Sequence, residues 1–366
     1  MKTTKTIIAL LFLGISSDLS SQLDDLTPEE IAYRDSITEL NLENESIANS
    51  QEAYNRGIEL FGLKKYSQAI KEFKKSIDLD PSFTAAYYNK GVAENESEKF
   101  SDGVVTLSQL IKTYPSYSKA YFQRGRSYQG LDDYLNAEKD YQNAIVLDKN
   151  NPNAFYNFGT LRFLQKDYNG AIQYFTQCLL LDDENINAYN DRGSAYRMNE
   201  SYAKALADYE TVVRKNPKLA FVLNNIGTTK TKMKDYPGAM AAFNRAISVD
   251  PNFHLAYNNR GIVQMHQKRL DDAIKDFEKA LAIQSDYSPA ASNISGIYFQ
   301  KEAYEEAVKY ADLAIKLNNQ NASAYVNRGM AKEMLRNMNG ACEDWFKARE
   351  LGAELGRKYH SENCGN

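Results

Sequence analysis

A glycine recurs every 34 residues along most of this 366-residue chain. Twelve residues after each glycine comes a small residue, and four residues further on there is usually an aromatic. No insertion breaks the period from about Ser50 to about Leu355. A fixed period of this length indicates a repeat array, in which each unit buries its apolar face against its neighbours. The periodic glycines are Gly57, Gly91, Gly125, Gly159, Gly193, Gly227, Gly261 and Gly329, with Ser295 at the remaining place.

The spacing inside one unit is helical. Tyr121, Gly125 and Tyr128 are four and three residues apart, which puts them on one face of a first helix. Ala137 and Tyr141 are related in the same way on a second helix. A glycine inside a helix costs roughly 1 kcal/mol relative to alanine, so its recurrence predicts that the two helices of each unit approach closely there.

These residues resemble the tetratricopeptide repeat (TPR) family, whose unit is a helix–turn–helix of 34 residues. The resemblance implies an all-α, right-handed TPR solenoid (superhelix) of about nine repeats over residues 50–355, with a capping helix and tail over 356–366. The match in the third unit is carried by Tyr121, Gly125, Tyr128, Ala137, Tyr141 and Ala144, with Lys149 in place of the usual proline.

The first residues have the pattern of a targeting segment. Lys2 and Lys5 precede an apolar run over residues 7–15, and small residues follow. A basic start, a short apolar core and small residues are typical of a secretory signal peptide, so we expect residues 1–21 to be removed near Ser21. The alternative is a short membrane anchor that is left in place. The signal peptide predicts an exported protein, periplasmic or secreted.

Residues 22–49 form a separate acidic segment. It contains eight acidic side chains and a single basic one, Arg34. The sequence of residues 27–30, Thr-Pro-Glu-Glu, predicts the start of a helix. Ile31, Ile37 and Leu40 could lay that helix on the first repeat as an N-terminal cap. The alternative is a solvated acidic tether.

Catalytic motifs are not found in the sequence. The histidines, His254, His266 and His360, lack the HExxH spacing of a metal site. No nucleophile elbow and no phosphate-binding loop occurs. The formal charge of −4 offers no basic field for nucleic acid. We therefore expect a protein without catalysis, cofactor, metal or nucleic-acid partner, and with no membrane span once the signal peptide has been removed.

The resemblance also implies where a binding site would be. In TPR proteins, two neighbouring positions near the start of each first helix line a concave groove. The second of these positions, here called the ladder position, is occupied by Asn55, Asn89, Gln123, Asn157, Asp191, Asn225, Asn259, Asn293 and Asn327. A primary amide can donate and accept hydrogen bonds at once and so matches a peptide bond. This pattern resembles the asparagine ladder of O-linked N-acetylglucosamine transferase, which holds extended peptide. Alternatively, the amides bond from one repeat to the next.

The residue just before the ladder position divides the groove in two. It is aromatic in the first four repeats, at Tyr54, Tyr88, Phe122 and Tyr156, and then polar at Asn190, Asn224 and Asn258. Aromatic faces suit apolar or proline-rich side chains. Alternatively, the aromatics are packing between repeats. The resemblance therefore predicts a protein- or peptide-binding scaffold that uses this groove. Two alternatives are a structural component of a cell-envelope assembly that docks through its outer surfaces, and a glycan-binding protein.

An alternation within the array predicts ion pairs. The residue before the glycine is arginine in every odd repeat, and an acid follows 16 residues later only there. We expect a bridge between the two helices of each odd repeat. The predicted pairs are Arg56–Glu72, Arg124–Asp140, Arg192–Asp208, Arg260–Asp276 and Arg328–Asp344.

Two cysteines near the C-terminus lie symmetrically about a predicted turn. Cys342 precedes Ala353 by 11 residues and Cys364 follows it by 11, so they would face each other across a helical hairpin. An oxidising compartment would allow them to form a disulfide. The alternative is two free thiols.

Overall fold

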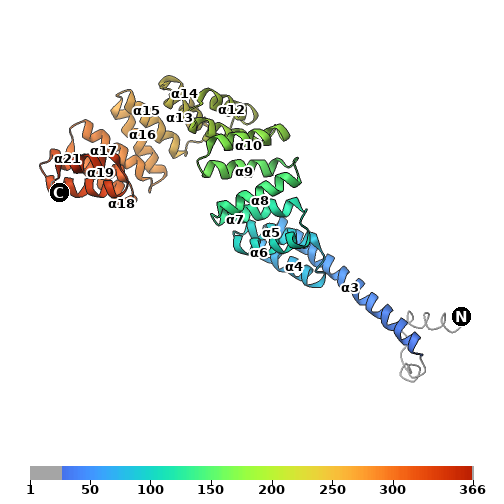
Figure 1. The fold of residues 1–366 in the computed structure, drawn as a ribbon. Coiled ribbons are helices and arrows are strands. Elements are labelled where there is room, and N and C mark those ends of the chain that lie inside the picture. Colours follow the sequence, from blue (N-terminus) through green and yellow to red (C-terminus); the bar gives the residue numbers. More distant parts are fainter. Residues whose placement is uncertain (1–26, 365–366) are drawn as a thin grey trace. The chain divides into compact units, whose positions relative to one another are not determined.

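The computed structural model describes residues 27–364, and every regular element in that range is an α-helix (Figure 1). The predicted signal peptide lies outside the described residues. The chain divides into two compact units, Met1–Lys149 and Asn150–Asn366, called unit 1 and unit 2 below. Within the described range, no helix combines the length and the apolar character needed to cross a bilayer.

From residue 27 onward, unit 1 contains three helix pairs, in which each helix packs against the next along the chain. Its first helices are α3, α5 and α7, and its second helices are α4, α6 and α8. Their bounds are α3 (Pro28–Gly62), α4 (Tyr66–Leu79), α5 (Thr84–Glu96), α6 (Phe100–Thr113), α7 (Ser118–Gly130) and α8 (Tyr134–Leu147).

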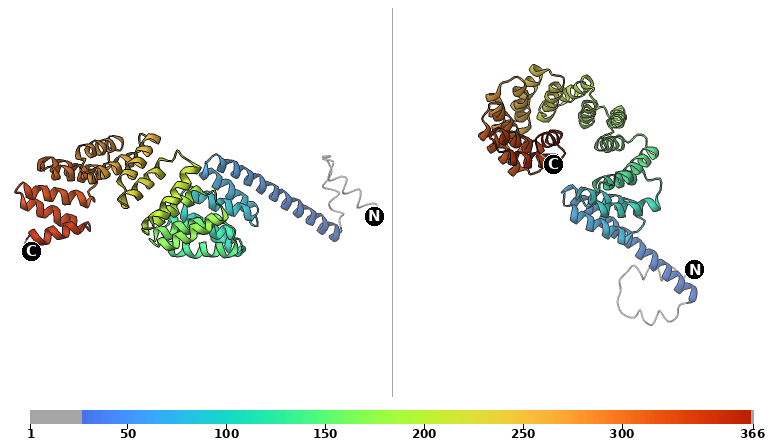
Figure 2. Two further views of the ribbon diagram at one scale, coloured as in Figure 1. Left: turned by 90° about the horizontal axis from the view of Figure 1, so that it is seen from above. Right: turned by 60° about the vertical axis from the view of Figure 1, so that its left-hand side comes forward.

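Up to residue 364, unit 2 contains six further pairs and a final helix, stacked in chain order (Figure 2). The odd-numbered helices α9–α19 are first helices, and the even-numbered helices α10–α20 are second helices. Their bounds are α9 (Pro152–Leu164), α10 (Tyr168–Leu181), α11 (Ile186–Met198), α12 (Tyr202–Lys215), α13 (Ala220–Lys232), α14 (Tyr236–Val249), α15 (His254–His266), α16 (Leu270–Ile283), α17 (Ser288–Gln300), α18 (Tyr304–Leu317), α19 (Ala322–Met334), α20 (Met338–Glu350) and α21 (Glu354–Asn363).

The recurrent glycines lie where the two helices of a repeat meet, as the sequence predicted. An ideal Cβ on Gly261 would lie 2.8 Å from the ring of Phe277, and one on Gly193 would lie 2.8 Å from the ring of Tyr209. Those rings are fully buried. The residue 16 positions after each glycine, which is aromatic except at Leu107, therefore fills the space that the missing side chain leaves.

Each turn between the two helices of a repeat has the same backbone conformation. One residue per turn has a φ near +60°, and none of the nine is glycine. Such a residue ends a helix in the left-handed conformation and lets the following N–H groups return to the last carbonyls. For a non-glycine residue, the left-handed conformation costs roughly 1–2 kcal/mol. The residues are Lys64, Glu98, Asp132, Lys166, Glu200, Lys234, Lys268, Glu302 and Arg336.

The acidic N-terminal segment is continuous with the first repeat. Helix α3 begins after Thr27, as predicted, and runs without a break through the glycine at Gly57 (Figure 1). Of the two alternatives for this segment, the cap on the first repeat is not formed, because Ile37 and Leu40 remain 37% and 51% exposed. Contact with the second helix ends near Ser46, whose hydroxyl donates to the Leu79 carbonyl at 2.8 Å. Helix α4 ends at Leu79, so it does not extend along the part of α3 that precedes Ser46.

The predicted arginine–carboxylate bridges form in four of the five odd repeats. In each, Nε and Nη2 of the arginine donate to the two oxygens of a buried aspartate on the second helix. Nη1 of the same arginine also donates to the second helix of the preceding repeat, for example from Arg260 to Asn244 Oδ1 at 2.7 Å. One guanidinium therefore joins three helices. The pairs are Arg124–Asp140, Arg192–Asp208, Arg260–Asp276 and Arg328–Asp344.

The bridge predicted in the first repeat is wrong. Arg56 pairs with Glu52 on its own helix at 3.0 Å, and Glu72 Oε2 is buried with no hydrogen-bond partner. Within residues 27–364 no repeat precedes this one, so Arg56 has no earlier second helix there to bind with Nη1. It turns toward solvent instead, where the Arg56 side chain is 52% exposed.

Candidate functional site

The ladder positions of unit 2 lie on consecutive first helices, where the 34-residue period places them at equivalent points. From α13 onward each ladder asparagine donates from Nδ2 to the residue 35 positions earlier, on the preceding first helix. Each acceptor is the residue just before the ladder position of the preceding first helix. The bonds are Asn225 to Asn190 Oδ1 (3.1 Å), Asn259 to Asn224 Oδ1 (2.9 Å), Asn293 to Asn258 Oδ1 (3.1 Å) and Asn327 to the Ser292 carbonyl (2.9 Å).

These bonds use only part of what the amides offer. A primary amide has two N–H donors and an oxygen that can accept twice. Asn258 Nδ2 donates to Asn259 Oδ1 at 3.2 Å. Within residues 27–364, no hydrogen bond is made by Oδ1 of Asn225, Asn293 or Asn327, all of which are half-buried. The interpretation that the amides bond between repeats is therefore confirmed here, and fixed acceptors remain beside those bonds.

Two aromatic positions of unit 1, Tyr54 and Tyr88, pack between repeats, as the alternative interpretation held. Tyr54 lies 4.8 Å from Phe83, measured between ring centroids, and its Oη accepts from Asn89 Nδ2 at 2.9 Å. Burial raises the pKa of Tyr54, against the opposing effect of that hydrogen bond. Tyr88 meets Tyr117 edge to face at 5.8 Å. Phe122 instead packs within its own repeat, where its ring is tilted against the buried ring of Tyr141 with centroids 6.3 Å apart.

Three ladder positions do not join a ladder. Asn55 is exposed and accepts from Gln51 on its own helix, and Asn157 donates to the Asn153 carbonyl one turn earlier. Gln123 is buried beside Asn95, whose Nδ2 donates to the Gln123 carbonyl at 2.8 Å. Asn95 was not among the residues predicted from the sequence. The signal was the glycine at Gly103, where a Cβ would lie 2.8 Å from Asn95 Oδ1.

The change from aromatic to polar positions occurs within unit 2. Tyr156 Oη donates to Asp191 Oδ2 at 2.7 Å, and Asn190 Nδ2 donates to Asp191 Oδ1 at 2.9 Å. Burial raises the pKa of Asp191, while those two hydrogen bonds act in the opposite direction. Burial, with the nearby carboxylate, also raises the pKa of Tyr156. Asp191 thus takes the place of a ladder amide, with a carboxylate that accepts both bonds.

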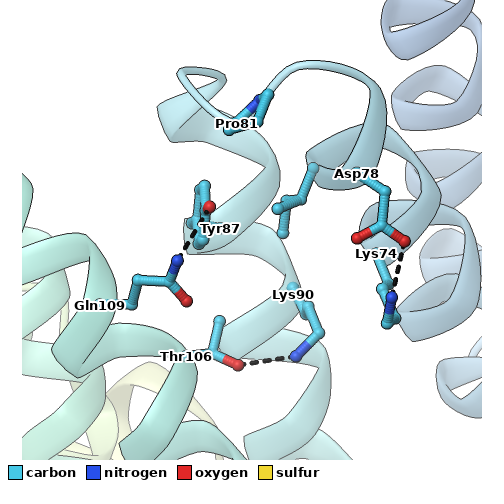
Figure 3. A pocket seen from close by; sticks show the side chains of 8 residues that line it. Lys74, Asp78, Pro81, Tyr87, Lys90, Thr106 and Gln109 are labelled. Carbon is cyan, nitrogen blue, oxygen red and sulfur yellow. Dashed lines mark hydrogen bonds and ion pairs between the residues drawn. The ribbon is translucent and has the colours of Figure 1, made fainter.

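A cavity open to solvent lies away from the ladder positions, between α4, α5 and α6 (Figure 3). Its volume is about 500 Å³. Lys90 Nζ donates to Thr106 Oγ1 at 2.7 Å and Gln109 Nε2 to Tyr87 Oη at 3.2 Å. None of these residues was predicted from the sequence to form a site. Because its polar groups bond mainly to one another, the cavity has no convergent set of free groups for a ligand.

A disulfide joins Cys342 on α20 to Cys364, just after α21. The two Cα atoms are 5.7 Å apart, and the bond closes a loop with a sequence separation of 22. Tyr359 also packs on the buried Trp345, with ring centroids 5.4 Å apart. Helix α21 thus covers the last complete repeat through a covalent and an aromatic contact.

Comparison with known families agrees with these features. Two models described as tetratricopeptide repeat match the chain, one at residues 254–287 and the other at residues 50–83, 118–151, 152–185, 222–253 and 289–321. Together the matches cover more than half of the sequence, and the chain belongs to the TPR family. Repeats of this kind generally form non-catalytic scaffolds for protein interaction. Among curated proteins, none matches the chain.

Solved structures with the same fold come from several proteins. A tetratricopeptide repeat protein from Parabacteroides merdae is 16% identical, with a TM-score of 0.53 over 68% of this chain and 99% of that one. The C-terminal part of a TPR protein from Cytophaga hutchinsonii is 16% identical, with a TM-score of 0.53 over 66% and 98%. A chain of the Cut9–Hcn1 hetero-tetramer of the APC/C is 15% identical, with a TM-score of 0.53 over 73% of this chain and 52% of that one. At these identities the likeness concerns the fold alone.

Proposed function

We propose that unit 2 binds an extended segment of another protein along its amide row. The amide row consists of Asn190, Asn224, Asn225, Asn258, Asn259, Asn293 and Asn327. The observation that carries the proposal is the set of hydrogen bonds between successive repeats, which hold these amides in fixed orientations. Groups that are already oriented lose little entropy when they bind a partner.

The chemistry of the row suits a peptide main chain. The unused Oδ1 atoms of Asn225, Asn293 and Asn327 can accept from peptide N–H groups. Packed helices are separated by roughly 10 Å, and an extended chain rises about 3.3 Å per residue. Each repeat would therefore meet about every third peptide unit. Binding of this kind reads the backbone and leaves the sequence of the partner loosely specified.

Selection of peptides from a displayed random library tests the proposal. The full chain is immobilised, and the selected peptides are measured again on a double variant, Asn225→Ala with Asn293→Ala. We expect at least about a tenfold loss of affinity, since each lost hydrogen bond contributes roughly 1 kcal/mol. A matched variant on exposed positions of second helices, Glu210→Ala with Lys279→Ala, should bind as the unchanged chain does.

Stability must be measured alongside binding, because the row also joins the repeats. Asn225→Ala and Asn293→Ala each remove one bond to the preceding repeat, so we expect a loss of about 1 kcal/mol per substitution. Peptides that bind the folded double variant with unchanged affinity would show that the amide row is purely structural. In that case the scaffold would bind through another surface.

We further propose that the protein acts outside the cytoplasm. The basic and apolar start of the sequence supports export, and a disulfide between Cys342 and Cys364 suits an oxidising compartment. Fractionation of the native cell, followed by N-terminal sequencing, should find the protein outside the cytoplasm and beginning near Gln22. Recovery of the intact N-terminus from the cytoplasm would contradict this.

A further inference from the structure

The N-terminal half of α3 carries an apolar stripe that no part of the described chain covers. Tyr33, Leu40 and Ile47 are 58%, 51% and 48% exposed, and Ile37 is exposed beside them. The stripe follows steps of four, three, four and three residues once Asn44 is included. Apolar residues at alternating steps of three and four are the pattern of a coiled-coil seam.

The register of the stripe is that of a heptad repeat, whose seam positions are called a and d. Tyr33, Leu40 and Ile47 take position d, while Ile37 and Asn44 take position a. A single asparagine at position a is the feature that fixes a parallel, two-stranded pairing, because the two amides face each other and bond only in that register. The register therefore indicates that the partner is a second, parallel copy of this helix.

Charge at the flanking positions agrees with pairing between two copies. In a parallel dimer, position g of one helix faces position e of the other, five residues later. This brings Glu29 opposite Arg34 of the second copy, and Glu43 opposite the neutral Ala48. No pair of like charges faces across the seam at these positions. Asp35, Glu39 and Glu45 lie at outer positions, where both copies keep them in water.

The rest of the first repeat leaves the stripe accessible. The face of α3 that packs on its own repeat contains Ser50, Ala53 and Gly57, which are buried. At 100° per residue, this face lies roughly a third of a turn from the stripe. A second helix can therefore approach the stripe without displacing α4. The preceding a position, Glu30, lies in the first turn of α3, where paired helices can separate.

We propose that the protein forms a homodimer through a parallel coiled coil of residues 33–47 of α3. The two copies pair through the seam residues, with the two Asn44 side chains facing each other. A dimer of this kind places two complete repeat arrays at one end of a shared stalk. Any partner that repeats its binding segment would then be held by two sites, with a gain in avidity that needs no new contact.

Sedimentation equilibrium on the full chain tests the dimer. We expect a mass that rises with concentration toward twice the 41.5 kDa of one chain. Leu40→Glu should weaken dimerisation at least about a hundredfold, since the symmetric seam loses two leucines and gains two charges. Leu42→Glu is the matched control: Leu42 is 61% exposed on the same helix but lies off the seam, so dimerisation should not change.

Cross-linking tests the register. Asn44→Cys should form an interchain disulfide rapidly, because position a of a parallel pair faces its own copy, whereas Leu42→Cys should not. The native cysteines do not interfere, since Cys178 is buried and the other two are bonded to each other. A chain that remains monomeric at its highest soluble concentration would overturn the proposal and leave the stripe to another partner. Equal cross-linking at positions 42 and 44, or a dimer that persists in Leu40→Glu, would overturn it as well.

Discussion

The bridge between Arg260 and Asp276 can be replaced by a pair that the protein itself uses in the neighbouring repeat. Arg260 Nε lies 2.7 Å from Asp276 Oδ2 and Nη2 lies 2.6 Å from Oδ1. The arginine side chain is 21% exposed and the aspartate 8%. The repeat before it has the buried apolar pair Ile226 and Ala242 at the same two positions. The substitutions Arg260→Ile and Asp276→Ala therefore copy an arrangement that already packs in this fold.

The two single variants should both be strongly destabilised. Arg260→Ile leaves a carboxylate almost fully buried without its partner, and breaking a buried pair in this way costs roughly 3–5 kcal/mol. Asp276→Ala should cost less, about 2–3 kcal/mol, because the arginine is partly exposed and keeps its bond to Asn244. The smaller cost thus follows from the exposure of the group that is left behind.

The double variant should lie close to the unchanged protein. Replacing a buried ion pair by apolar residues of suitable size is often neutral or stabilising, so we expect a free energy of unfolding within about 1 kcal/mol of the original. The coupling energy in the double-mutant cycle would then be at least about 3 kcal/mol.

Hydrogen exchange at the amides of α15 and α16 is the appropriate assay. A solenoid unfolds through its individual repeats, so a global transition can hide a local change. Local exchange reports the opening free energy of the altered repeat directly. Costs that simply add in the double variant would refute the reasoning. The first repeat supplies the control: Arg56→Ile and Glu72→Ala should show no coupling, because these two side chains do not meet.

Three further predictions concern single positions. Gly261→Ala should destabilise the protein by about 1–3 kcal/mol, because the added methyl group crowds the ring beside it. Gly296→Ala should stabilise it by up to about 1 kcal/mol, because no atom lies closer than 3.6 Å to the added Cβ. Thermal denaturation compares the two variants, and equal effects would contradict the role given to the helix contact. Glu200→Gly should stabilise by roughly 0.5–1 kcal/mol, since its φ of +57° suits glycine; a lower melting temperature would argue against strain at this turn. Asp191→Asn should raise the urea midpoint at neutral pH, because burial raises the pKa of that carboxyl and makes its ionised form unfavourable when folded. The gain should shrink as the pH falls through the folded-state pKa of Asp191, and a gain that does not depend on pH would refute this cause.

The sequence by itself determined the features that repeat. A helix pair, a close contact at each glycine and an aromatic residue 16 positions later recur with the 34-residue period, and the structure places them accordingly. The four bridges such as Arg260–Asp276 could be predicted for the same reason. A contact between fixed positions of one repeat depends on local helix geometry, so the same residues produce it each time.

The tertiary structure alone decided which hydrogen-bond partner a side chain takes where the repeat pattern ends or changes. Arg56 has the same sequence position as Arg260 but lacks a preceding repeat, so it bonds within its own helix. The direction of each ladder amide likewise depends on which acceptor its neighbour presents, and Asn157 turns to its own helix while Asn259 reaches the preceding first helix. An amide that can reach several partners gains only about 1 kcal/mol from any of them, and the packed neighbours settle that choice.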